Sequence, residues 1–461
     1  MGRKFIGRET ELTALREKYR QDGFQMAVIY GRRRIGKTTM INKFIDETGG
    51  RAISFVAVER QEKDLLKMMG DAVMGALHPE LAGMAGFESF EKIFDMVAAE
   101  GKKERIIFFI DEYPYLVAAC PYMNSLIQKY VDYDWKDTEV FLILCGSLVS
   151  FMKDEVLSKS APLHGRSTLE FRLRPFGYYE TGLFFPDRTA EERAMIYGLT
   201  GGVAKYIEQI DPEKSLDENI ADQFFSSTGY FTEEQIKTVI TGEKQSPGVY
   251  SAILEAIANG HTAYNEIATA VGMQEISYYL KMLTKSEFIE KRVSGHPYYV
   301  ITDGMLIFWF RYVSRAASLI NAGKGKLYYE NVVKGRLHEF MGPVFEDMAK
   351  EYIWRNIGTD GIPLMTEIGE YQASVKDAEG KIRQIEIDLL GKMDKKIVLA
   401  GECKFRQQKF GKADLDAFNE KIRFLPADNV TRMLFSLRGF TDAVEKEPDN
   451  LILTDLHQMY V

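Results

Sequence analysis

A short apolar segment that runs directly into a glycine-bounded loop is the strongest constraint on how this chain can fold. Residues Met26–Tyr30 are apolar and predict a buried strand. The residues that follow, Gly31-Arg-Arg-Arg-Ile-Gly-Lys-Thr-Thr39, fit the pattern GxxxxGK followed by Ser or Thr. This pattern has a structural meaning only between a strand and a helix, which is the context predicted here. The sequence therefore predicts a loop that encloses phosphate groups.

Each residue type in this loop has a physical role. Glycine at positions 31 and 36 lets the backbone bend so that its N–H groups point at phosphate oxygens, and the helix that begins at Lys37 adds its positive end. Lys37 would reach the β- and γ-phosphates, and the Thr38 hydroxyl would bind Mg²⁺. We expect ATP and Mg²⁺ as ligands, with nucleotide contacts from Gly31, Arg32, Arg33, Arg34, Ile35, Gly36, Lys37, Thr38 and Thr39.

Acidic residues follow a second apolar strand. Arg105–Ile110 ends in Asp111-Glu112, which would place the Asp111 carboxylate near Mg²⁺ and let Glu112 polarise the attacking water as a general base. The alternative is an ordinary helix cap or solvated turn. An apolar strand at 52–58 lies between the two motifs, which is typical of the class with an extra strand and a catalytic glutamate. A strand at 140–145 leads to Ser147, a candidate γ-phosphate sensor or a simple helix cap.

Further segments accompany these motifs in a specific order over most of residues 1 to 210. They are Phe5-Ile-Gly-Arg-Glu-Thr-Glu-Leu12, Gly146-Ser147, Pro162-Leu-His-Gly-Arg166, Leu173-Arg-Pro-Phe176 and Gly201-Gly202. In this combination the chain resembles the archaeal-type P-loop ATPases, which are also widespread in bacteria and are related to AAA+ and STAND proteins. The resemblance implies an α/β fold with a parallel sheet, and it places Gly7 and Arg8 near the nucleotide base.

Arg166 is the best candidate for an arginine that senses or stabilises the transferring phosphoryl group, because a guanidinium can stabilise the charge of that group. A structural salt bridge is the alternative. The family often has proline in a Gly-Gly-x-Pro segment, where this chain has Ala204. This departure leaves the local loop geometry open but does not bear on nucleotide binding.

Residues 246–312 predict a winged helix-turn-helix-like module. Amphipathic helices and a two-stranded hairpin with a turn at Ser294-Gly295 give the expected spacing. The second helix would offer Gln274, Ser277, Tyr278 and Lys281 to a groove. The segment from 246 to 300 has four basic and five acidic residues, so its net charge of −1 favours protein contact or interdomain packing at least as much as DNA binding.

Three charged residues near the C-terminal end alternate along two predicted strands. Asp388 lies on the first strand, and Glu402 and Lys404 share a face of the second. If these strands are antiparallel neighbours, the three side chains can converge, and Glu346 can approach from a helix. Carboxylates of this kind bind Mg²⁺, and a nearby lysine steadies an attacking water. The alternative is a solvated cross-strand charge pair.

This arrangement resembles the PD-(D/E)xK nuclease-like fold over roughly residues 335 to 461, although Ile387 stands where the motif has proline. The resemblance implies catalytic Asp388, Glu402 and Lys404, with Glu346, Asp388 and Glu402 as metal ligands. A basic stretch made of Lys404, Arg406, Lys409 and Lys412 is consistent with a phosphate backbone nearby.

The expected organisation has four parts: a P-loop ATPase core at 1–190, a helical lid-like segment at 191–245, the winged module at 246–312 and the nuclease-like domain at 313–461. We also expect the helix at 327–354 to be interrupted, or to start afresh, near Gly342-Pro343.

The amino-acid composition excludes some classes of function. With 59 basic and 67 acidic residues among 461, the formal charge of −8 excludes a globally basic nucleic-acid coat. Three cysteines do not form a disulfide framework and indicate the cytoplasm, and the absence of a long apolar run argues against a membrane span. We expect ATP hydrolysis that drives or gates a nucleic-acid-directed nuclease domain, with DNA as a candidate partner. The alternative is a nucleotide-dependent interaction switch whose C-terminal domain only binds a partner protein or a second copy.

Overall fold

The computed structural model describes residues 5–81, 86–232, 247–294, 296–376, 380–427, 429–447 and 450–461. The chain forms two compact units. The first comprises Met1–Pro175, Val203–Lys205 and Lys285–Glu287, and the second comprises Phe176–Gly202, Tyr206–Thr284 and Phe288–Val461. Residues 233–246 of the expected lid-like and winged segments, and Gly295 of the expected turn, lie outside the described residues.

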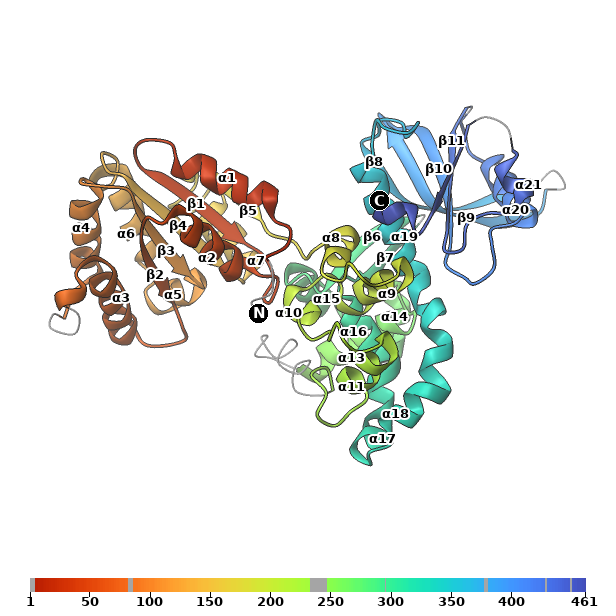
Figure 1. The fold of residues 1–461 in the computed structure, drawn as a ribbon, viewed down its shortest axis with the longest axis horizontal. Coiled ribbons are helices and arrows are strands. Elements are labelled where there is room, and N and C mark those ends of the chain that lie inside the picture. Colours follow the sequence, from red (N-terminus) through yellow and green to blue (C-terminus); the bar gives the residue numbers. More distant parts are fainter. Residues whose placement is uncertain are drawn as a thin grey trace. The chain divides into compact units, whose positions relative to one another are not determined.

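Strands and helices alternate along the first unit (Figure 1). Its strands are β1 (Gln25–Tyr30), β2 (Arg51–Val56), β3 (Ile106–Asp111), β4 (Val140–Gly146) and β5 (Leu169–Arg172). Its helices are α1 (Glu9–Tyr19), α2 (Lys37–Thr48), α3 (Glu62–Leu77), α4 (Phe90–Gly101), α5 (Tyr113–Ala119), α6 (Met123–Lys129) and α7 (Val149–Phe151).

Within the described residues, the five strands form one parallel sheet in the order β2-β3-β4-β1-β5. The strand that separates β1 from β3 is therefore β4, whereas β2, which lies between them in the sequence, forms an edge. Because all strands are parallel, the carboxyl ends of β1, β3 and β4 lie along the same side of the sheet, which is called its carboxyl edge. The loop after β1, the acidic pair after β3 and Ser147 after β4 all lie at this carboxyl edge.

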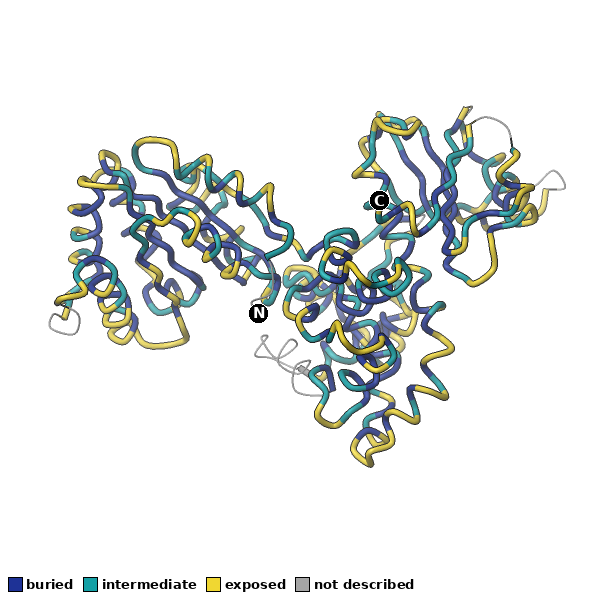
Figure 2. Tube along the Cα trace, viewed as in Figure 1, coloured by how far each residue is buried: buried dark blue, intermediate teal, exposed yellow. Residues whose placement is uncertain are grey.

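Helices cover both faces of this sheet, which explains why its central strands β1, β3 and β4 are apolar and buried along their length (Figure 2). Successive residues of a strand point to opposite faces. Ala27 and Ile29 pack with residues of α1 and α2, whereas Met26 and Val28 belong to the core under α3 to α6.

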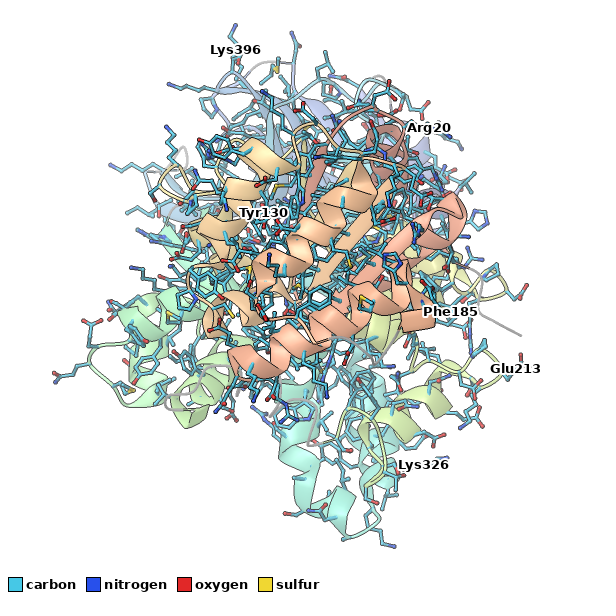
Figure 3. The ribbon with its side chains drawn as sticks, turned by 90° about the vertical axis from the view of Figure 1, so that its left-hand side faces the viewer. Arg20, Tyr130, Phe185, Glu213, Lys326 and Lys396 are labelled. Carbon is cyan, nitrogen blue, oxygen red and sulfur yellow. The ribbon has the colours of Figure 1, made fainter. Side chains whose placement is uncertain are left out.

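An aromatic cluster forms part of the core between the sheet and helices α3 to α6. Tyr130, labelled in Figure 3, packs edge-on against Phe94, and Trp135 lies 5.3 Å from both rings. The Tyr130 hydroxyl donates to Asp95 at 2.6 Å, so its polar end is paired although the ring is buried.

The second unit begins with helices and continues into the C-terminal sheet. Its helical part contains α8 (Tyr178–Leu183), α9 (Ala190–Thr200), α10 (Ala204–Ile207, shared with the first unit), α11 (Leu216–Phe224), α13 (Pro247–Ala258), α14 (Tyr264–Val271), α15 (Ser277–Lys285), α16 (Gly304–Phe308), α17 (Ala317–Asn321), α18 (Gly325–Tyr328) and α19 (Leu337–Arg355). Strands β6 (Ile289–Ser294) and β7 (His296–Ile301) pair antiparallel directly after α15.

The C-terminal part is a mixed sheet in the order β12-β11-β10-β9-β8. Its elements are β8 (Glu367–Lys376), β9 (Ile382–Met393), β10 (Lys396–Lys404), α20 (Lys412–Ile422), β11 (Thr431–Ser436), α21 (Asp442–Glu445) and β12 (Leu451–Asp455). Strands β8, β9 and β10 pair antiparallel, and β10, β11 and β12 pair parallel. The turn between β9 and β10 is Asp394-Lys395, in which both residues have positive φ, as a tight hairpin requires.

The expected interruption at Gly342-Pro343 is wrong, because α19 runs through Pro343 without a break. The prediction also missed β5 and β8, whose residues are mostly half-buried or exposed and show no apolar run. No helix among the described residues is both long and apolar enough to cross a bilayer.

The first prediction concerns the central strand β4. Replacing Leu142, which is fully buried, by Ala should lower the free energy of unfolding of the first unit by about 2–5 kcal/mol, because it leaves a cavity in the core. Native-state hydrogen exchange of the β3 and β4 amides measures this loss within that unit alone. The control Tyr133→Ala removes a side chain that is 75% exposed and should change exchange little. Equal effects of the two variants would contradict the packing described here.

Candidate functional site

The loop after β1 has the bend that phosphate binding needs. Gly31 has φ +155°, and a Cβ there would lie 2.3 Å from the carbonyl oxygen of Leu173. Gly36 has φ +92° and forms the N-cap of α2, and Arg34 also has a positive φ. Only glycine fits at position 31, so the loop keeps its backbone close to the segment that follows β5.

The Lys37 ammonium lies inside this loop. It donates to the carbonyl oxygens of Gly31 at 2.7 Å and Arg32 at 2.9 Å, and the residue is almost fully buried. A buried charge needs such partners. The lysine is thus positioned at the N-terminus of α2, where its charge and the helix dipole both favour an anion.

Thr38 and Asp111 meet at the same place. The Thr38 hydroxyl donates to Asp111 Oδ2 at 2.5 Å, which joins the start of α2 to the end of β3. The other oxygen of Asp111 accepts the Glu112 N–H at 2.8 Å. A hydroxyl oxygen next to a carboxylate oxygen suits Mg²⁺, which prefers oxygen ligands and retains several waters. Thr38 and Asp111 are the residues of this site that fit that ion.

Glu112 and Ser147 are also brought together. Both the Ser147 N–H and its hydroxyl donate to Glu112 Oε2, at 3.2 and 2.7 Å. Arg33 donates to the Ser147 hydroxyl at 3.3 Å and to the Tyr115 hydroxyl. Glu112 itself has φ +50° and forms the N-cap of α5. Glu112 thus occupies the N-cap position, but its side chain does not cap the helix and instead directs its carboxylate at the residue that follows β4.

Two contacts at this site could not be read from the sequence. Tyr115, one turn into α5, is the partner of Arg33, and its ring lies beneath that guanidinium at 5.9 Å. Lys205, next to Ala204, donates its backbone N–H to the Arg34 carbonyl at 3.0 Å. Neither residue belongs to a motif, and each is recognisable only once the fold brings it to the loop.

The N-terminal segment supports the loop from the other side. The buried Arg8 guanidinium donates to the carbonyl oxygens of Ile35 at 3.3 Å and Arg174 at 2.7 Å. Gly7 and Arg8 both have positive φ. Arg8 thus links the start of the chain to the phosphate loop and to the strand segment after β5.

Arg166 forms the structural salt bridge that was the alternative to a sensing role. Its Nε and one terminal nitrogen donate to the two Asp132 carboxylate oxygens, each at 2.7 Å, and its other terminal nitrogen donates to the Pro162 carbonyl at 2.8 Å. The pair raises the pKa of Arg166 and lowers that of Asp132. A role for Arg166 at a phosphoryl group stays a prediction.

In the second unit, the charged residues of β9 and β10 face each other as the antiparallel condition required. Ala400 is paired with Leu390 and Gly401 with Leu389, so Glu402 lies opposite Asp388 in the same register. The Cys403 N–H donates to Asp388 Oδ2 at 2.8 Å. Lys404 donates to Glu402 Oε1 at 2.8 Å.

Helix α19 adds Glu346 to these carboxylates. Burial, and then the nearby charge of Asp388, raises the pKa of Glu346 to about 8. Burial and the charge of Glu402 raise the pKa of Asp388 to about 6. The two carboxylates therefore share a confined region in which their negative charges repel each other.

A second lysine forms an ion pair with Glu402. Lys421, in the last turn of α20, lies 2.9 Å from each of the two Glu402 carboxylate oxygens. Sequence reasoning missed it, because one lysine on an amphipathic helix carries no motif. Among the described residues, no group of three His, Cys, Asp or Glu side chains is close enough to hold a metal ion, so Glu346, Asp388 and Glu402 do not form a ready-made cation site.

The β6–β7 hairpin packs against the C-terminal part. Arg292 of β6 lies 3.4 Å from both Asp347 and Glu370, and the Tyr298 hydroxyl donates to Glu370 at 2.6 Å. Lys350 bridges the same two carboxylates at 3.0 and 3.2 Å. Although burial opposes it, the Asp347 carboxylate and its neighbours raise the pKa of Arg292. These contacts secure one face of the hairpin.

The face predicted to enter a groove is exposed. Gln274, Ser277, Tyr278 and Lys281 are all exposed on or before α15. The expected basic stretch is partly neutralised by neighbours, since Arg406 pairs with Asp414 and Lys412 pairs with Glu447.

Comparison with solved structures shows the fold. The Walker-type ATPase of Pyrococcus abyssi superimposes with a TM-score of 0.53 at 20% sequence identity, covering 67% of this chain and 96% of that chain. At this identity the likeness concerns the fold alone.

Comparison of sequences shows the family. Residues 5–210 match the ATPase domain found predominantly in Archaea, and residues 309–415 match a domain of archaeal and bacterial proteins of unknown function. An uncharacterized protein of Methanocaldococcus jannaschii is 33% identical over 358 residues, which are 76% of this chain and 77% of that protein. An uncharacterized ATP-binding protein of the same archaeon is 40% identical over 42 residues, 9% of this chain and 71% of that protein. The chain therefore belongs to the archaeal ATPase family defined by that N-terminal domain.

Proposed function

We propose that this chain binds ATP with Mg²⁺ and hydrolyses it at the loop after β1. The observation that carries the proposal is the meeting of Lys37, at the N-terminus of α2, with the Thr38–Asp111 pair at the carboxyl edge of the sheet. A cationic side chain at a helix N-terminus suits the phosphates of a Mg–nucleotide complex, and an oxygen pair next to it suits the Mg²⁺ ion. Membership of an ATPase family supports the same function.

The residues of the site have separate roles in this mechanism. Lys37 and the loop amides hold the β- and γ-phosphates, while Thr38 and Asp111 hold the cation, which supplies charge neutralisation when bound. Glu112 accepts a proton from water as the water oxygen bonds to the γ-phosphorus and the bond to the β,γ-bridging oxygen breaks. Ser147 orients Glu112 through its N–H and hydroxyl, and Gly7 and Arg8 support the loop near the base.

The second prediction tests phosphate binding. Lys37→Ala should weaken ATP binding by about ten- to a hundredfold and abolish hydrolysis, because the charge-assisted contacts to phosphate are lost. Calorimetric titration with ATP and Mg²⁺ measures this loss. Lys43→Ala is the matched control, because Lys43 lies on the same helix but pairs with Glu47 at 3.3 Å on the surface. Unchanged turnover in Lys37→Ala would remove the ATPase assignment.

The third prediction tests water activation. Glu112→Gln should retain ATP binding but slow hydrolysis by about 10²–10⁴-fold, since an amide does not accept the proton. Single-turnover phosphate release from pre-bound ATP separates this step from binding. Glu104→Gln is a suitable control, because Glu104 precedes β3 at the opposite edge of the sheet and pairs with Arg51 at 2.7 Å. If Glu112→Gln releases phosphate at the normal rate, another residue activates the water.

For the C-terminal part, we propose a nuclease-like domain directed at nucleic acid and gated by the ATPase. Strands β9 and β10 are antiparallel, Asp388 lies opposite Glu402, and Lys404 contacts Glu402, which supports the grouping expected for such a domain. The exposed polar face of α15 supports a winged module, whose hairpin serves interdomain packing through Arg292. The second candidate is an interaction switch, favoured by the engagement of Glu402 with two lysines.

The fourth prediction separates these candidates. If the domain cleaves, Mg²⁺-dependent degradation of DNA in the presence of ATP should disappear in Asp388→Asn and persist in Asp394→Asn. Asp394 lies in the β9–β10 turn with φ +48°, a conformation that asparagine adopts readily. Gel analysis of labelled DNA measures the cleavage. Equal cleavage by both variants would point to a contaminating nuclease and favour the switch.

A further inference from the structure

We propose that Lys421 is a latch that keeps divalent cations from Glu402, so that the C-terminal carboxylates bind a cation only after this lysine moves away. The inference rests on the proposed nuclease-like domain and names the residue that would gate it. Its basis is the position of the Lys421 ammonium relative to the two oxygens of Glu402.

Both oxygens of the Glu402 carboxylate are engaged. Lys421 Nζ lies 2.9 Å from Oε1 and 2.9 Å from Oε2, and Lys404 Nζ lies 2.8 Å from Oε1. Glu402 is only 4% exposed, so solvent does not screen these contacts as it would at the surface. The pairs are therefore unlike exposed salt bridges, which contribute little.

The ammonium and a divalent cation compete for the same oxygens. A cation bound by Glu402 would replace the bidentate contact with Lys421, and the positive charges of lysine and cation would repel each other at that distance. A cation therefore binds Glu402 only if the contact between Lys421 and Glu402 is lost.

The neighbouring carboxylates lie near positive charges but do not contact them directly. Within the described residues, neither Asp388 nor Glu346 forms an ion pair, although the charges of Lys404 and Lys421 act on Asp388 and that of Lys350 acts on Glu346. Lys404 contacts only Oε1 of Glu402, whereas Lys421 contacts both oxygens, so loss of the Lys421 contact frees Oε2 for a cation shared with these side chains.

Lys421 and Lys404 differ in how they reach Glu402. Lys404 follows Glu402 by two residues on β10, so the strand itself holds the two side chains on one face. Lys421 reaches across from α20, a separate element, through a flexible four-carbon side chain. A rotation of the Lys421 side chain or a small shift of α20 removes it without disturbing the sheet, which suits a latch.

Cation binding to the full-length chain tests the latch without reference to cleavage. Mn²⁺ binding is measured by electron paramagnetic resonance for the wild type, Asp388→Asn, Lys421→Met, Lys421→Arg and the double variant Lys421→Met/Asp388→Asn. The Asp388→Asn difference isolates this site from Mn²⁺ bound at the phosphate loop. Lys421→Gln serves in place of Lys421→Met if the latter does not fold.

We expect Lys421→Met to bind Mn²⁺ at least about tenfold more tightly than the wild type, since one charge-assisted contact no longer competes. Lys421→Arg should behave as the wild type because it keeps the positive charge, and the gain should vanish in the double variant. Wild-type binding as tight as that of Lys421→Met, and lost in Asp388→Asn, would overturn the latch but keep the cation site. No Asp388-dependent binding in any variant would overturn both.

Discussion

The enclosure of the Lys37 ammonium by its own loop is the interaction on which the rest of the first unit depends. The loop must turn back far enough for the Gly31 and Arg32 carbonyls to reach the lysine. That turn brings position 31 so close to the Leu173 carbonyl that no side chain fits. The phosphate loop is therefore shaped from both sides, by α2 and by the segment that follows β5. Arg8, which contacts Ile35 and Arg174, ties the same two segments together.

Local patterns predicted β1, β3 and β4 to within a residue because both faces of these strands are covered, so each is a plain apolar run. The sheet order was beyond such patterns, because the neighbour of a strand is set by long-range packing. This is why β4, and not the strand next in sequence, separates β1 from β3. The half-buried β5 has no apolar run, although the loop depends on it. The partner of Arg166, Asp132, is likewise visible only in the fold.

For the C-terminal carboxylates too, sequence patterns predicted only the contacts between neighbouring strands. Strand alternation was enough to group Asp388 with Glu402 and Lys404, because a period of two and one tight turn fix their register. It did not predict the contact with Lys421, which lies on a separate helix, 19 residues from Glu402 in the sequence. Nor did it reveal that Arg292 of the hairpin pairs with Asp347. Motifs identify side chains that share an element or a hairpin, while ion pairs with other elements become visible only in the fold.

The Lys37 site and the Glu402 site each contain a buried charge. A buried charge without a partner is energetically costly. Lys37 is partnered by loop carbonyls, and Glu402 is partnered by Lys404 and Lys421. A ligand that enters either site exchanges an internal contact for its own, so its affinity is reduced by the value of the contact it displaces. The carbonyls around Lys37 are neutral, so an anion that took their place would displace no full charge. Lys421 carries a full charge, so opening Glu402 requires a larger compensation, such as movement of α20.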